Sequence, residues 1–97
     1  MATGTIKKSL FTTAVLNLPE SCTVPSNGFF SLQFNPALSG YIPIAIISYN
    51  LADRALGGNI FITGFYVAEN VAIIYGKGNP GTVISTNATA TILYKSS

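Results

Sequence analysis

Apolar and polar residues alternate in short stretches along this chain, and turn-forming residues separate the stretches at regular intervals. Between positions 29 and 34, the apolar side chains Phe30, Leu32 and Phe34 alternate with polar ones. A repeat of two residues indicates a strand with one buried face. No stretch has apolar residues at the three-and-four spacing of a helix, and strand-favouring Ile, Val, Thr, Phe and Tyr dominate. The pattern predicts an all-β chain without a helix of consequence.

The turn residues divide the chain into six strand regions, some of which could be broken further. We expect these strands at 5–18, 29–34, 41–49, 59–67, 71–75 and 82–95, with loops or turns at 19–28, 35–40, 50–58, 68–70 and 76–81. Many short strands at this spacing are typical of an antiparallel sandwich or barrel. Because 97 residues suit one domain, we expect residues 1–97 to form a single domain.

The stretch from Tyr41 to Ile47 is apolar on both faces of its expected strand. Pro43 lies within it and cannot donate a hydrogen bond to a neighbouring strand, so this position should be an edge, a bulge or a strand start. An edge strand that is apolar on both faces is prone to association unless something covers it. This favours a partner subunit, with the interface expected at Tyr41, Ile42, Ile44, Ile46 and Ile47.

The aromatic residues are expected to fill two roles. Phe30, Phe34, Phe61 and Phe65 occupy positions expected to be in the core. The five tyrosines lie near strand ends, where a ring can pack while its hydroxyl reaches water: Tyr41, Tyr49, Tyr66, Tyr75 and Tyr94. Tyrosines beside Asn, Asp and Lys on loops are also typical of a sugar-binding surface, although a structural role is the commoner one.

Charge is scarce, and this excludes much chemistry. Only five Lys or Arg and three Asp or Glu occur in 97 residues, histidine is absent, and the net charge is +2. A Ser-His-Asp triad is therefore impossible, and the scattered basic residues form no nucleic-acid stripe. The carboxylates Glu20, Asp53 and Glu69 all lie at expected turns, and the single Cys22 excludes an internal disulfide or a cysteine metal site. We expect no enzymatic activity, no metal and no cofactor.

Neither a membrane span nor an export signal is expected. The longest apolar run, 41–47, is too short to cross a bilayer, and the apolar stretch 10–18 is interrupted by polar residues, so it does not read as a signal core. The glycine-rich segment 76–81 is not a phosphate-binding loop either, because Lys77 is misplaced within it and a strand follows. A hairpin or bulged turn is expected there.

The second half of the chain has a distinctive order of strands and loops. It contains the strand Gly40-Tyr41-Ile42-Pro43-Ile44-Ala45-Ile46-Ile47-Ser48-Tyr49, a loop at 50–58, two apolar strands at 60–67 and 71–75, and the ending Thr89-Ala90-Thr91-Ile92-Leu93-Tyr94-Lys95. This order resembles the small C-terminal head domains of bacteriophage and prophage tail-fibre proteins of Gram-positive or gut bacteria. It implies a β-sandwich head that assembles as a homotrimer at a fibre tip. Loops at the exposed end would then contact a host cell-surface glycan or protein.

Together these features predict an all-β, jelly-roll-like antiparallel sandwich that acts as a non-enzymatic receptor-binding head. It is expected at the virion tail tip, or in the bacterial cytoplasm when expressed from a prophage. The ligand is expected to contact Tyr49, Asn50, Asp53 and Arg54 first, and then Lys77 and Asn79. Two alternatives remain open: a purely structural virion or capsid-decoration protein, and a lectin-like carbohydrate-binding module.

Overall fold

A computed structural model describes residues 10–51, 54–55 and 59–97 of the chain. These residues form nine strands and no helix, which confirms the all-β prediction. The strands are β1 (Phe11–Asn17), β2 (Cys22–Thr23), β3 (Phe29–Phe34), β4 (Tyr41–Asn50), β5 (Arg54–Ala55), β6 (Ile60–Ala68), β7 (Val71–Gly78), β8 (Val83–Ile84) and β9 (Thr89–Ser96). The described part of the chain accordingly offers no helix that could cross a membrane.

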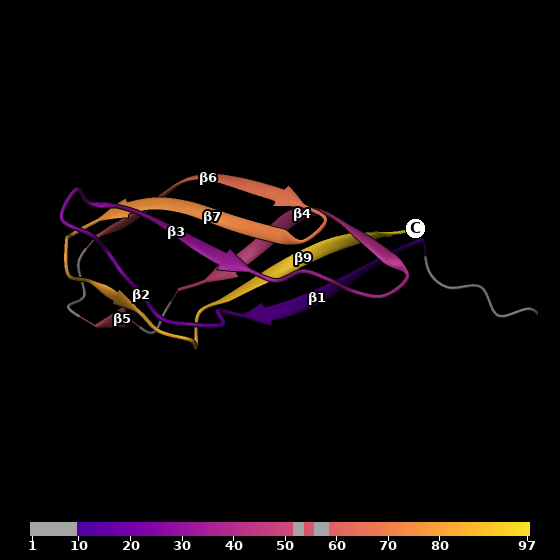
Figure 1. Cartoon of the computed structure of the whole chain (residues 1–97), viewed down its shortest axis with the longest axis horizontal. Coiled ribbons are helices and arrows are strands. Elements are labelled where there is room, and N and C mark those ends of the chain that lie inside the picture. Colours follow the sequence, from indigo (N-terminus) through magenta and orange to yellow (C-terminus); the bar gives the residue numbers. More distant parts are fainter. Residues whose placement is uncertain (1–9, 52–53, 56–58) are drawn as a thin grey trace, which may run out of the picture.

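Two three-stranded antiparallel sheets form the body of the molecule (Figure 1). One has the order β1-β9-β4 and the other the order β3-β7-β6, and a third small sheet, β2-β8-β5, lies at one end. The central strand of each large sheet comes from the second half of the chain and pairs with strands on both sides. The arrangement is compatible with a β-sandwich.

The core lies between the two large sheets. From β7 it receives Ala72 and Ile74, and from β9 it receives Ala90, Ile92 and Tyr94, all at most 1% exposed. The alternation predicted for residues 29–34 is confirmed, because Phe30, Leu32 and Phe34 of β3 are buried as well. Each of these strands therefore has one face in the core and one face toward solvent.

Strand β4 lies at the edge of its sheet, one of the three positions that Pro43 allowed. It pairs only with β9 among the described strands, and its register shifts between Pro43 and Ala45 and again between Ile46 and Ser48. Each extra residue reverses which side chains face the core. The alternation of this strand is therefore irregular rather than strict.

The structure corrects several expected boundaries. The loop predicted at 76–81 begins later, because 76–78 continue β7 and only Asn79, Pro80 and Gly81 turn. The last strand, expected over 82–95, is two strands: a turn in which Ala88 N–H donates to the Ser85 carbonyl at 3.0 Å separates β8 from β9. The short strands β2 and β5 lie where only loops were expected, and positions 5–9 of the expected first strand lie outside the described residues.

Two predictions about aromatic residues are wrong. Phe61 and Phe65 were expected in the core, but both are more than half exposed. Phe61 pairs with Lys77 and therefore lies on the outer face of the sheet. The register shift between Ile62 and Gly64 puts Phe65 on the opposite face, but β6 is an edge strand, and there the Phe65 ring lies beside the exposed Tyr49 rather than in the core. Tyr94 was expected to reach water with its hydroxyl, but it is buried, and its Oη donates to the Pro36 carbonyl at 2.7 Å.

Candidate functional site

A hollow of about 320 Å³ lies at one end of the outer face of the β3-β7-β6 sheet. We call it the aromatic hollow, and its lining residues are Asn27, Gly28, Phe29, Asn59, Phe61, Lys77, Gly78 and Asn79. They come from the starts of β3 and β6, the end of β7 and the turns beside them. The strand ends of this sheet thus meet in one place although they are far apart in sequence.

The register of the sheet sets the centre of the aromatic hollow. Phe29 of β3 and Phe61 of β6 both pair with Lys77 of β7, so the three side chains stand in a row across the sheet on the same face. Directly opposed side chains in such pairs have Cβ atoms about 5 Å apart. A lysine therefore stands between two phenylalanines that are 60% and 56% exposed.

Two turns hold this row in position. Before β3, the Gly28 N–H donates to the Pro25 carbonyl at 2.9 Å, and the positive φ of Gly28, 83°, suits a residue without a Cβ. The Gly78 N–H then donates to the Gly28 carbonyl at 2.8 Å, which ties this turn to β7. After β7, the Thr82 N–H closes the second turn on the Asn79 carbonyl at 3.2 Å.

Three asparagines surround the row. Asn27, Asn59 and Asn79 are all exposed side chains in the lining of the aromatic hollow. The Phe29 N–H donates to Asn27 Oδ1 at 3.0 Å, so the oxygen of this amide accepts a local hydrogen bond. The aromatic hollow therefore combines two apolar rings with amide groups and one ammonium group.

Lys77 is the only charged side chain among the described residues that line the aromatic hollow. The described lining contains no carboxylate beside this lysine. Aromatic rings and a few polar groups in a concave site are typical of ligand pockets.

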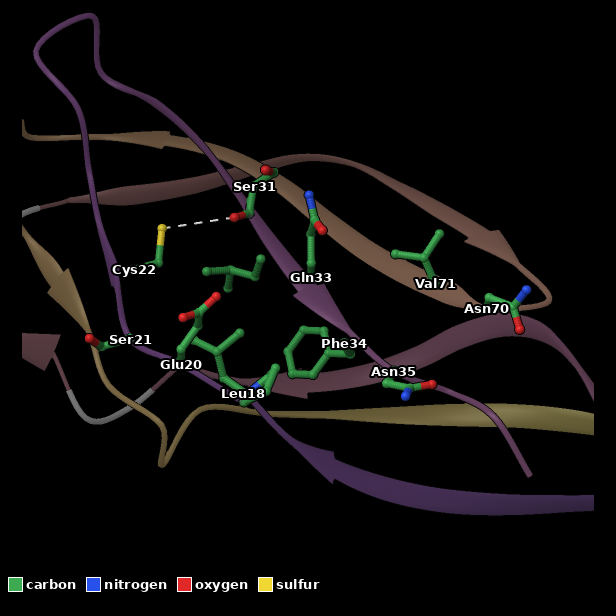
Figure 2. Close-up of a pocket in the computed structure, with 12 residues that line it drawn as sticks. Leu18, Glu20, Ser21, Cys22, Ser31, Gln33, Phe34, Asn35, Asn70 and Val71 are labelled. Atoms are coloured by element: carbon green, nitrogen blue, oxygen red, sulfur yellow. Dashed lines mark hydrogen bonds between the residues drawn. The ribbon is translucent and has the colours of Figure 1, made fainter. Parts of the chain in front are cut away.

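A larger hollow, of about 520 Å³, follows the outer edge of β3 (Figure 2). We call it the edge groove, and its lining includes Glu20, Cys22, Ser31 and Gln33. The Cys22 thiol points toward the Ser31 carbonyl, at 3.8 Å from Sγ to O, and burial raises the pKa of this thiol. A protonated thiol is a poor nucleophile, and the one ring in the lining, Phe34, is buried in the core, so the edge groove offers no exposed aromatic surface.

The structure brings two of the expected ligand contacts together. Lys77 and Asn79 line the aromatic hollow. Tyr49 and Asn50 end β4, where the Tyr49 ring lies 6.0 Å from the ring of Phe65. Asp53 lies outside the described residues, and Arg54 belongs to β5, where it pairs with Ile84.

The expected interface residues on β4 divide into two groups. Ile42, Ile44 and Ile47 are exposed. Tyr41 and Ile46 are half-buried and pack against the core of their own chain. The large exposed hydrophobic side chains of this edge strand are therefore these three isoleucines and Tyr49.

Sequence reasoning missed the two rings of the aromatic hollow. Phe29 begins a strand beside the turn at Asn27-Gly28, and its place opposite Lys77 depends on a pairing between segments 48 residues apart. Phe61 was assigned to the core by its position in an apolar strand. The turn residues around Asn27 and Asn79 were the available signal, because such turns lie at the ends of strands.

Comparison of the chain with models of protein families, with curated proteins and with solved structures finds no match.

Proposed function

We propose that this protein is a non-enzymatic attachment domain that binds a carbohydrate in the aromatic hollow. The observation that carries the proposal is the row of Phe29, Lys77 and Phe61, two exposed rings on either side of a lysine. Large exposed apolar groups gathered beside polar ones mark binding surfaces more often than scattered single ones do. A sugar offers an apolar C–H face to a ring and hydroxyl groups to amides, and the aromatic hollow has partners for both.

The same sheet face extends beyond the aromatic hollow. Tyr75 lies two residues from Lys77 on β7, and Tyr66 is paired with Ile73 further along, so both side chains are on the outer face. Both tyrosines are exposed, and successive residues on one face of a strand are about 6.8 Å apart. This spacing supports a ligand longer than a single sugar, whose later units contact the tyrosines.

The proposal includes assembly of the domain as a homotrimer through β4. Ile42, Ile44 and Ile47 leave apolar surface on an edge strand, and the two register shifts prevent this strand from turning all of it inward. Three weak sugar sites on one rigid assembly bind a multivalent cell surface much more tightly than one site does. The resemblance of residues 40–49 to tail-fibre head domains supports a jelly-roll-like head at the tip of a phage fibre.

A purely structural virion protein is the second candidate. The outer face of the β1-β9-β4 sheet also carries exposed apolar side chains, among them Phe11 and Val15. Such a face favours permanent assembly contacts as much as attachment to a host. The two candidates differ in whether the protein binds any glycan.

The test is binding to a printed array of bacterial surface glycans and to whole bacterial cells. The double variant Phe29→Ala/Phe61→Ala removes both rings, and Phe11→Ala, which removes a ring that is 55% exposed on the other sheet, is the matched control. Loss of an anchoring ring costs about 2 kcal/mol, so binding of the double variant should fall about 30-fold or more. A wild-type protein that retains no glycan and no cells would favour the structural candidate and overturn the proposal.

A further inference from the structure

We infer that the ligand of the aromatic hollow is an acidic saccharide, and that its anionic oxygens are bound by Lys77. The inference rests on the proposed function and names the chemical class of the ligand. It starts from the place of the lysine: β7 is the central strand of its sheet, so Lys77 does not protect a free sheet edge, which is a common role of lysines on β-proteins. It stands instead between the two exposed rings at the centre of the concave surface.

Charge points to an anion. The described lining of the aromatic hollow contains one cation and no carboxylate, although the whole chain has only eight charged residues. The described carboxylates lie elsewhere, with Glu20 in the edge groove and Glu69 in the turn after β6. The described lining therefore presents a positive charge with no carboxylate beside it. An anionic group on the ligand would pair with this charge, and a neutral sugar would not.

The balance of hydrogen-bonding groups points the same way. The ammonium group of Lys77 has three donors and no acceptor. Asn27 Oδ1 already accepts the Phe29 N–H, so this amide adds mainly donors. A neutral sugar hydroxyl both donates and accepts, whereas a carboxylate or phosphate only accepts. Asn59 and Asn79 each add one amide oxygen and two N–H donors, so donors still outnumber acceptors in the lining and match a ligand rich in acceptors.

The two rings define where the anionic group sits. Because Phe29 and Phe61 flank Lys77 in the register of the sheet, a sugar ring that packs on either phenylalanine lies next to the lysine. Partial shielding by the rings strengthens an ion pair relative to one in open water. The shared chemistry is an anionic oxygen group on a sugar, either the carboxylate of a uronic or sialic acid or the phosphate of a phosphorylated glycan.

The test compares three sets of immobilised glycans: neutral, carboxylated and phosphorylated. The variants are Lys77→Gln, which removes the charge, Lys77→Arg, which keeps it, and the control Lys95→Gln on the other large sheet. Loss of a charge-assisted hydrogen bond predicts about 10- to 100-fold weaker binding of acidic glycans by Lys77→Gln. We expect Lys77→Arg to retain most of the binding and Lys95→Gln to match the wild type. Binding should also weaken as salt rises from 50 to 500 mM, because the pair is partly exposed.

The outcomes distinguish the inference about an acidic ligand from the proposed function of carbohydrate binding. Preference for carboxylated or for phosphorylated glycans, lost in Lys77→Gln, supports the inference and identifies which anion is bound. Binding of neutral glycans with equal affinity by wild type and Lys77→Gln overturns the inference and leaves the proposed function standing. Absence of binding to all three sets overturns the proposed function itself. Circular dichroism of each variant separates loss of binding from loss of folding.

Discussion

The hydroxyl of Tyr94 makes a buried hydrogen bond in the core, and its removal is a quantitative test of the packing between the two large sheets. The side chain is 1% exposed, and its Oη donates to the Pro36 carbonyl at 2.7 Å. Pro36 lies between β3 and β4 and is also fully buried. The hydrogen bond therefore links the segment between β3 and β4, which joins the two large sheets, to the central strand β9. The variant Tyr94→Phe removes this donor and nothing else.

The expected loss of stability follows from the carbonyl left behind. A buried acceptor without its partner costs about 1–3 kcal/mol of unfolding free energy. For a domain of this length, each 1 kcal/mol lowers the melting temperature by about 4–8 °C. Urea unfolding followed by tyrosine fluorescence and circular dichroism, at one fixed protein concentration, measures the difference. Tyr75→Phe is the matched control, because that ring is 40% exposed and its change should stay within about 0.5 kcal/mol.

The pH dependence of the unfolding free energy provides a second test of the buried Tyr94 hydroxyl. Burial raises the pKa of Tyr94 above the 10.0 of an unperturbed tyrosine. The folded state therefore holds this proton more tightly than the unfolded state, and the stabilisation is present below pH 10 and is lost as pH rises through the folded-state pKa. Tyr94→Phe lacks this group, so the gap between wild type and variant should narrow above pH 10. Equal stability of the two proteins at pH 7, or a gap that is unchanged from pH 7 to 11, would refute the reasoning.

Three further changes test other parts of the structure. Gly76→Ala should lower the unfolding free energy by about 1–3 kcal/mol in urea titrations, because the added Cβ would collide with the Phe30 ring and lie 2.9 Å from the Phe61 carbonyl oxygen. The control Gly64→Ala has room for a Cβ and should change the unfolding free energy little. Thr82→Val should raise the unfolding free energy by about 1 kcal/mol, because the buried Thr82 Oγ1 has no partner among the described residues; a loss would show that the hydroxyl is bonded. Alkylation of Cys22 by iodoacetamide at pH 7.5 should be several-fold slower in the folded protein than in urea, as burial raises the pKa of the thiol; equal rates would contradict this.

Assembly is tested separately from stability and binding. Light scattering of the wild type should give three times the mass of one chain. Ile47→Lys places a charge on the exposed side of β4 and should shift the mass toward that of a single chain. Gln33→Lys, a change at another exposed position, on the edge strand β3, should leave the trimer intact. A single-chain mass for the wild type would contradict trimer formation.

The sequence was most informative where one strand could be read by itself. The alternation in β3 identified its buried face, and Pro43 limited its own position to an edge, a bulge or a strand start, because both depend on local chemistry. The faces of β6 could not be read, since the register shift after Ile62 reverses the alternation within an apolar run. A bulge is set by the partner strand and leaves little trace in the residues themselves.

The candidate site was predictable only in part for the same reason. Lys77 and Asn79 were singled out because a glycine- and proline-rich turn carries them. Phe29 and Phe61 become their neighbours only through the pairing of β7 with strands on both sides. Tyr94 was misjudged because its position near the end of a strand conceals that β9 is the central strand of its sheet. Pairing between distant segments, rather than local pattern, positions both the site and the core bond.

The most direct measurement is a map of amide chemical-shift changes in the ¹⁵N-labelled protein during titration with the array glycan that binds most strongly. The largest changes should fall on Asn27, Phe29, Asn59, Phe61 and Lys77, with smaller ones at Tyr75. Changes centred on the edge groove at Glu20 and Cys22, or on Tyr49 at the end of β4, would contradict the assignment of the aromatic hollow as the binding site.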